Sequence, residues 1–206
     1  AADSVLPDQY RLFHMGMEKE YVLTFAKLTL KGAVFLEASN KERKYESGIF
    51  IDIFPLDKTV ADQAKRQKQI RKTWFYARLG VLSRYYNPQL PAAMAGWKKS
   101  VLRAVLTVAH AGMKVLGMTK ERMFDRYMKW ATMYNEQDCA IYADFSYPDP
   151  ERILMPAEEL FPTKQVLFEN LTVEIYNGYD PILRRQYGDY MQLPPEDQRH
   201  NHLPYR

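Results

Sequence analysis

Gly48-Ile-Phe-Ile-Asp-Ile-Phe-Pro-Leu-Asp57 is the stretch that decides how this chain is interpreted. Its alternation predicts a β-strand over residues 48–54 with isoleucines on one face and Phe50 and Phe54 on the other, both faces being apolar and buried. Asp52 falls on the phenylalanine face, where an unpaired carboxylate is costly. Two kinds of partner are open: an intramolecular Lys or Arg, or a metal or ligand at a strand end, which we favour. Pro55 ends ladder pairing just beyond it.

The composition fits one large domain, or a core with an elaborate insertion. Of the 206 residues, 47% are hydrophobic and 26% are charged, which supplies a core and excludes wholesale disorder. Cys139 is the one cysteine of the sequence, so an intramolecular disulfide and a cysteine-rich zinc motif are excluded. The first residues contain no signal-peptide pattern, and we expect the chain to begin within a longer polypeptide.

The net charge of +4 conceals a strong segregation of sign. Residues 58–130 carry 16 Lys and Arg against 3 acidic residues, a net charge of +13, and tryptophans and tyrosines lie among them. This pattern predicts contact with a polyanion or with an anionic membrane surface; a solvated helical face is the alternative. No helix-turn-helix, zinc-finger or RRM signature accompanies the charge, so nucleic acid is not expected as a partner.

Local patterns predict both helices and strands. Apolar periodicity predicts helices over residues 61–86, 96–118 and 120–135, the last with Thr119 as N-cap. A short helix over residues 180–187 would be capped by Asp180 and ended by Gly188. Charged residues within 101–118 exclude a membrane span and leave an amphipathic or core helix. The expected strands lie at 140–145, in a hairpin of 21–28 with 33–36 about Gly32, and in a hairpin of 165–168 with 171–176.

Two separated stretches resemble the LicD/fukutin-related phosphotransferase family. The first joins residues 27–37 to Ile-Phe-Ile-Asp-Ile-Phe-Pro-Leu-Asp57, and the second joins residues 168–180 to Arg185-Gln-Tyr-Gly-Asp-Tyr-Met-Gln-Leu-Pro-Pro195 and His202. The resemblance spans residues from about 5 to 203 in order. It implies an α+β fold with a partial nucleotidyltransferase-like mixed-sheet core in residues 1–57, a basic helical insertion in 58–136, and a C-terminal part, 137–206, that completes the core.

The resemblance also implies an activity. Such proteins move a phospho-alcohol group from a nucleotide diphosphate donor, most often phosphocholine from CDP-choline, onto teichoic acid or lipopolysaccharide sugars. It implies Mg²⁺ or Mn²⁺ held by carboxylates, with Asp52 as metal ligand and catalytic residue. An anionic or lipid-linked glycan would be the acceptor, at the cytoplasmic face of the membrane. A non-catalytic module that binds anionic glycan or membrane through the basic insertion is the alternative.

The remaining candidates for substrate binding are Lys27, Glu37, Asp57, Tyr187, Asp189 and His202. Lys27 would reach donor phosphate from a strand beside that of Asp52, and an exposed strand lysine is the alternative. Glu37 and Asp57 could bind metal, orient Lys27 or cap loops. The other three lie in the matched C-terminal motif, where a structural tyrosine, a turn aspartate and a tail histidine are the alternatives. The family's Asp-Asp-x-Asp block is not in this sequence, so we expect the polypeptide alone to lack two of three metal carboxylates and to be inactive.

Overall fold

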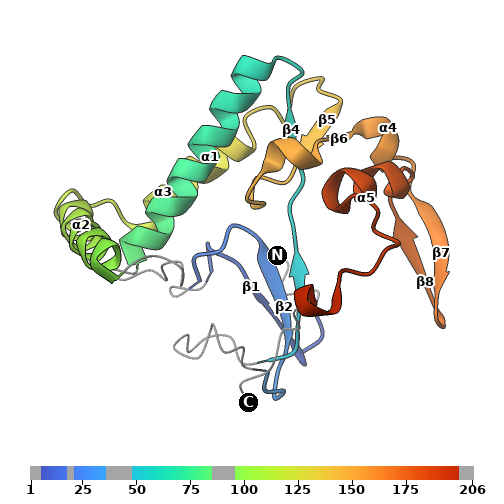
Figure 1. Cartoon of the computed structure of the whole chain (residues 1–206), viewed down its shortest axis with the longest axis horizontal. Helices are drawn as coiled ribbons and strands as arrows, with labels where there is room; N and C mark the ends of the chain where they lie inside the picture. Colours follow the sequence, from blue (N-terminus) through green and yellow to red (C-terminus); the bar gives the residue numbers. More distant parts are fainter. Residues whose placement is uncertain (1–5, 18–20, 36–47, 85–95, 200–206) are drawn as a thin grey trace.

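The computed structural model describes residues 6–17, 21–35, 48–84 and 96–199. Within these residues, helices and small antiparallel sheets alternate along the chain, which confirms the α+β class. Figure 1 shows one sheet below a group of helices, with the C-terminal strands and the last helix on the opposite side of the molecule from helix α2.

The lower sheet carries the first candidate residues. It has the order β1 (Tyr10–Phe13), β2 (Ala26–Leu30) and β3 (Phe50–Ile53), and both strand pairs are antiparallel. The expected hairpin of residues 21–28 with 33–36 is wrong. The turn at Gly32 is present, with φ of 81°, but residues 33–35 form no strand and β2 pairs with β1 and β3 instead.

The expectation that β3 is buried on both faces is also wrong. Its isoleucine face is open to solvent, and Ile51 is 66% exposed. The cause is that the small antiparallel sheet is covered on one face only: Lys27 and Phe13 on the Asp52 face are buried, and the isoleucine face is left open. Phe54 beyond the strand is half exposed as well.

Two further sheets follow along the chain. β4 (Asp57–Thr59), β5 (Ile141–Ala143) and β6 (Met155–Pro156) form one. β7 (Lys164–Phe168) and β8 (Leu171–Ile175) form the hairpin expected from the sequence, with Glu169 at φ of 55°. Every strand pair in the described residues is antiparallel, so they do not form the mixed sheet that was expected. The division at 57/58 falls inside β4.

The helices follow the sequence pattern closely. They are α1 (Gln63–Arg84), α2 (Gly96–Val115), α3 (Lys120–Ala131), α4 (Ala157–Leu160) and α5 (Tyr179–Tyr187), with 3-10 turns at Pro150–Ile153 and Glu196–Gln198. Thr119 caps α3 by accepting a hydrogen bond from Arg122 N. Gly188 ends α5 with φ of 74°. The capping role of Asp180 is wrong, because its carboxylate accepts from Arg184 and Tyr190.

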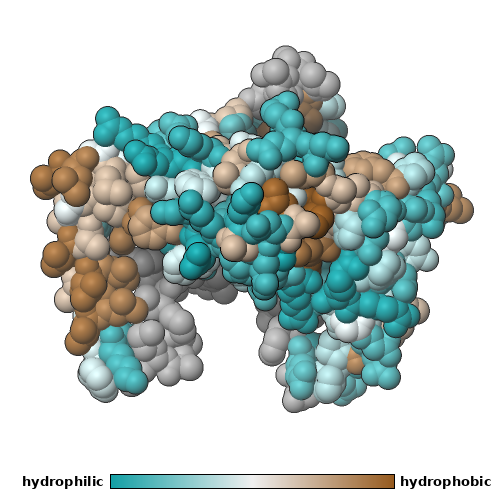
Figure 2. All heavy atoms as spheres, turned by 90° about the horizontal axis from the view of Figure 1, so that it is seen from above, coloured by the Kyte–Doolittle hydropathy of each residue, from teal (hydrophilic) through white to brown (hydrophobic). Residues whose placement is uncertain are grey.

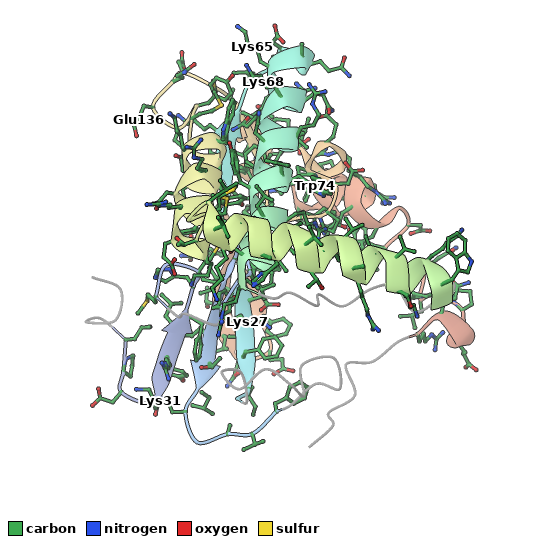
Figure 3. All side chains as sticks on the ribbon, turned by 90° about the vertical axis from the view of Figure 1, so that its left-hand side faces the viewer. Lys27, Lys31, Lys65, Lys68, Trp74 and Glu136 are labelled. Carbon is green, nitrogen blue, oxygen red and sulfur yellow. The ribbon has the colours of Figure 1, made fainter. Side chains whose placement is uncertain are left out.

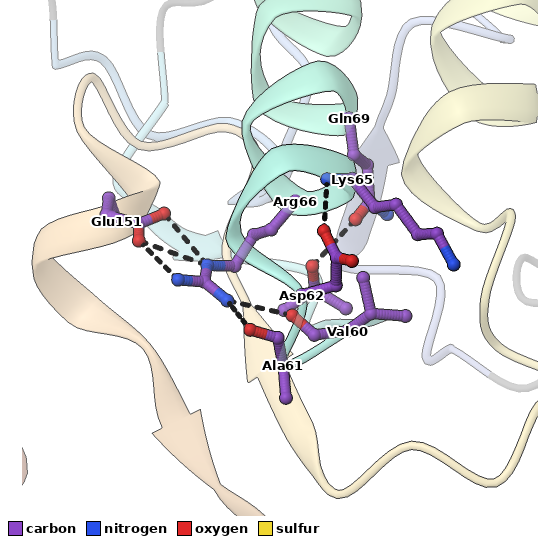
Figure 4. Close-up of polar contacts among 8 residues, drawn as sticks. Val60, Ala61, Asp62, Lys65, Arg66, Gln69 and Glu151 are labelled. Atoms are coloured by element: carbon purple, nitrogen blue, oxygen red, sulfur yellow. Dashed lines mark hydrogen bonds and ion pairs between the residues drawn. The ribbon is translucent and has the colours of Figure 1, made fainter.

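Polar side chains fasten the helices to the sheets. Arg66 on α1 donates three hydrogen bonds to the Glu151 carboxylate and two to the carbonyls of Val60 and Ala61 (Figure 4). The buried Lys120 ammonium donates to the carbonyl of Met15, 2.7 Å away. These contacts fix α1 against the β4 region and α3 against the connection that follows β1.

Among the described residues, no single helix has both the length and the apolar character needed to cross a membrane. By length and composition alone, α2 and α3 meet that requirement only when taken together, as a pair bent by 92°.

Candidate functional site

Asp52 is paired with Lys27 across the first sheet. The two residues are direct neighbours in the β2–β3 register, and Lys27 Nζ lies 3.5 Å from Asp52 Oδ1. The same Nζ lies 3.6 Å from the centre of the Phe50 ring. Lys27 is 5% exposed. It lies at the end of β2 nearer to the helices, and Lys31 lies at the other end of the strand (Figure 3). Of the two partners left open by the sequence, the intramolecular lysine is therefore present.

The Asp52 carboxylate is nonetheless incompletely satisfied. Its Oδ1 is buried and accepts no hydrogen bond within the described part of the chain. The ammonium of Lys27, at ion-pair rather than hydrogen-bond geometry, is what faces it. The Asp52 side chain as a whole keeps 30% of its surface exposed, so a ligand in solution can reach it.

A second carboxylate, Asp57, lies beside Asp144. Asp57 begins β4 and pairs with Ala143 of β5, and Asp144 directly follows that strand. Burial raises the pKa of Asp57 and of Asp144, and the charge of Asp57 raises that of Asp144 further. Hydrogen bonds oppose these shifts: Asn135 Nδ2 donates to Asp57 Oδ1 over 2.8 Å, and Ser146 N donates to Asp144 Oδ1 over 2.8 Å. Two acidic groups thus share one partly buried place.

The charges of this acidic pair also act on two tyrosines, Tyr127 and Tyr176. Burial raises the pKa of Tyr127 above its ordinary range, and the charges of Asp57 and Asp144 raise it further. The Tyr127 hydroxyl is buried and makes no hydrogen bond among the described residues. Burial and then the charge of Asp144 raise the pKa of Tyr176 in the same direction. Both phenols stay protonated at neutral pH. Tyr176 is 40% exposed, so its O–H can donate to an oxygen of a ligand, whereas Tyr127 is 1% exposed and lies in the hydrophobic core.

The segment from Asp52 to Asp57 connects the Lys27–Asp52 pair to the Asp57–Asp144 pair. It leaves β3 at Ile53 and enters β4 at Asp57, so it crosses from the first sheet to the second (Figure 1). The Phe54 ring packs on the Phe25 ring, with 4.8 Å between their centres. Phe25 lies two residues before Lys27 in the chain, and the contact therefore holds this crossing segment against the start of β2.

The other predicted site residues are not brought to this segment. Tyr187 ends α5 and is exposed, and Asp189 follows in an exposed turn. In the part of the chain that the structure describes, neither shares a hydrogen bond or ion pair with Lys27, Asp52 or Asp57. Glu37 and His202 lie outside the described residues.

Asp144 and Tyr127 were not found from the sequence. A signal for Asp144 was available, because it follows a short apolar strand just as Asp52 was expected to end one. For Tyr127 there was none beyond its burial, since its helical spacing on α3 is that of an ordinary core residue.

Mg²⁺ and Mn²⁺ are held in proteins by several oxygen ligands together. The described ranges contain no group of three or more His, Cys, Asp or Glu placed to hold a metal ion. Asp57 and Asp144 supply hard carboxylate oxygens of the kind that Mg²⁺ and Mn²⁺ prefer. Burial is the main cause of the raised pKa of both, and a divalent cation would stabilise their ionised forms. Asp52 fits less well, since the Lys27 ammonium faces its Oδ1. Its role as metal ligand stays a prediction.

No family model, no curated protein and no solved structure matches this chain. The resemblance to the LicD/fukutin-related family therefore rests on the two sequence stretches that carry it.

Proposed function

We propose that this chain belongs to a divalent-cation-dependent phosphotransferase of the LicD type, with a nucleotidyltransferase-like core. It would move a phospho-alcohol group, first of all phosphocholine from CDP-choline, onto a cell-surface glycan such as teichoic acid or lipopolysaccharide. One observation carries the proposal: the motif that resembles the family runs from the Lys27–Asp52 pair to the Asp57–Asp144 pair. Basic and acidic groups of the kinds that phosphoryl transfer uses thus lie along one short segment.

The side chains divide the work as follows. Asp57 and Asp144 would hold the cation, which when bound neutralises charge on the donor diphosphate. Lys27 offers a point charge to a donor phosphate, and Asp52 keeps that ammonium in place at the end of β2.

The proposed acceptor is an anionic or lipid-linked glycan, reached from the cytoplasmic face of the membrane. The net charge of +13 in residues 58–130 supports an anionic partner. The basic surface would attract the acceptor, while the carboxylates would hold the cation that binds the donor diphosphate.

The test is phosphoryl transfer by the full-length product of the gene, followed by phosphorus NMR with CDP-choline, Mg²⁺ and teichoic acid. We expect release of CMP and formation of a phosphocholine ester. Asp144→Asn should lower the rate by about 100-fold or more, and Asp138→Asn, at an exposed aspartate, should leave it unchanged. Binding of Mn²⁺ to this chain, followed by electron paramagnetic resonance, should weaken in Asp144→Asn. Unchanged transfer in that variant would overturn the assignment of the acidic pair.

A second function is favoured by one observation. The pairing of Lys27 with Asp52 is what a purely structural carboxylate would show, and it agrees with a non-catalytic module that binds anionic glycan. The same experiment separates the two functions, because such a module would bind teichoic acid and consume no CDP-choline or other CDP-alcohol.

A further inference from the structure

Helix α2 turns an apolar face to solvent. Trp97, Val101, Val105, Val108 and Val115 are all exposed, and Val108 is 73% exposed. At 100° per residue, these positions form one continuous stripe along the helix. Figure 2 shows the hydrophobic surface that results, along the side of the molecule formed by α2. We call these five residues the α2 stripe.

The opposite face of α2 packs against the rest of the protein. Met113 is buried, and Leu102 and Leu106 on the same side are half-buried. His110 Nδ1 donates to the carbonyl of Leu82 on α1 over 2.6 Å. These contacts set the rotation of α2 about its axis, so that its second apolar face points away from the protein. A helix with two apolar faces needs a partner for each of them.

The charges of α2 are of one sign. Residues 96–115 contain no Asp or Glu and four Lys or Arg. Lys98 lies on one side of the α2 stripe, and Arg103 and Lys114 lie on the other, and all three are exposed. Lys98 Nζ is 5.6 Å from the centre of the Trp97 ring. Valines and a terminal tryptophan between basic flanks are typical of a helix that lies in a membrane interface.

We propose that α2 docks this protein on an anionic lipid surface, parallel to the membrane, with the α2 stripe among the acyl chains and its basic flanks on headgroup phosphates. A second copy of the chain fits this face poorly, because a symmetric contact would bring Lys98, Arg103 and Lys114 against the same cations. A hydrated glycan would leave the valines without an apolar partner. The inference does not depend on which reaction the protein performs.

Vesicle sedimentation tests the proposal with this chain. Vesicles of phosphatidylcholine with added phosphatidylglycerol should bind it, and vesicles of phosphatidylcholine alone should bind it at least about fivefold more weakly, since one Lys or Arg near an anionic surface contributes about that factor. Arg103→Gln and Lys114→Gln should each weaken binding to the anionic vesicles about fivefold. Binding should fall steeply as salt shortens the Debye length.

The α2 stripe has its own variants and a matched control. Val105→Asn with Val108→Asn should weaken binding about tenfold or more, because the apolar area inserted in the membrane is reduced. Valine and asparagine have similar helix propensity, and circular dichroism checks that the helix is kept. Leu167→Asn removes an equally exposed apolar side chain, 75% exposed on β7, and should leave binding unchanged. Trp97 fluorescence should shift to the blue on binding, and Trp97→Phe should lose that shift.

Several outcomes would overturn the proposal. Equal binding by the double valine variant and the parent chain would remove the α2 stripe from the contact. Equal binding to neutral and anionic vesicles would show that the basic side chains of α2 do not contribute to the contact. Self-association in analytical ultracentrifugation that the valine variant abolishes, without vesicle binding, would assign the face to a second copy. Binding of teichoic acid without vesicle binding would assign it to a glycan.

Discussion

The Lys27–Asp52 pair can be tested by a double-mutant cycle. Asp52→Asn keeps the volume of the side chain and removes the charge that faces the Lys27 ammonium. Lys27→Met keeps most of the apolar stem and removes the ammonium. The double variant removes both charges, so the difference between the sum of the single effects and the double effect measures their coupling.

The structure sets the size of the effect. At 3.5 Å, two unit charges attract each other by about 5 kcal/mol at an effective dielectric constant of about 20. Desolvation of the lysine offsets much of this, and water screens Asp52, whose side chain is 30% exposed. We therefore expect Asp52→Asn to lower the free energy of unfolding by about 2 kcal/mol, with a coupling of about 1–2 kcal/mol. For a chain of this length, Tm should fall by about 4–8 °C.

Urea unfolding of the four proteins at pH 7 gives the coupling energy. Lys31→Met, at the other end of β2, is the matched control and should show no coupling with Asp52→Asn. Additive single effects at Lys27 and Asp52 would refute the ion-pair reasoning. In the full-length protein we also expect Asp52→Asn to abolish transfer while the fold is retained, and near-normal turnover with Mg²⁺ would contradict a role in the site.

Three other changes have defined outcomes. Burial raises the folded-state pKa of Asp144 above its ordinary value of 3.8, so its ionised form costs stability above the folded pKa, and this cost disappears as pH falls through that pKa toward 3.8. Asp144→Asn should therefore raise Tm at pH 7 and not at pH 3.5, and a lower Tm at pH 7 would contradict the shift. Arg66→Met removes the bonds to Glu151 and to two carbonyls and should cost about 2 kcal/mol in urea unfolding; a change within experimental error would contradict this. Gly178→Ala would place a Cβ 3.0 Å from the Glu159 Cα and should lower Tm by about 2–12 °C, from about 1–3 kcal/mol of overpacking; an unchanged Tm would show that the backbone yields.

The elements that are determined by residues close together in the sequence could be predicted from the sequence. The three long helices, the Thr119 cap and the stop at Gly188 follow from spacing and side-chain chemistry within a few residues. The β7–β8 hairpin follows from the two-residue turn at Glu169-Asn170. Strand pairing between distant segments could not be predicted in this way. β1 was missed, and the partner of β2 was misassigned, because alternation identifies a strand and leaves its neighbours undefined.

The same limit governs the site. The need of Asp52 for a partner follows from its place in an apolar strand, but the identity of Lys27 depends on the β2–β3 register. Asp144 was missed because it meets Asp57 through the pairing of β4 with β5, far apart in the sequence. The exposure of the isoleucine face has a similar cause, since which face of the sheet is covered depends on distant segments of the chain.

Asp52 and the Asp57–Asp144 pair differ in their effect on the stability of the fold. Asp52 faces the Lys27 ammonium. Asp57 and Asp144 are brought near each other by the β4–β5 pairing instead, and burial raises the pKa of both even though Asn135 and Ser146 donate hydrogen bonds to them. A fold that keeps two such groups together gives up stability at neutral pH, and perturbed acids of this kind gather at functional sites. The search for a bound cation should therefore begin at the Asp57–Asp144 pair.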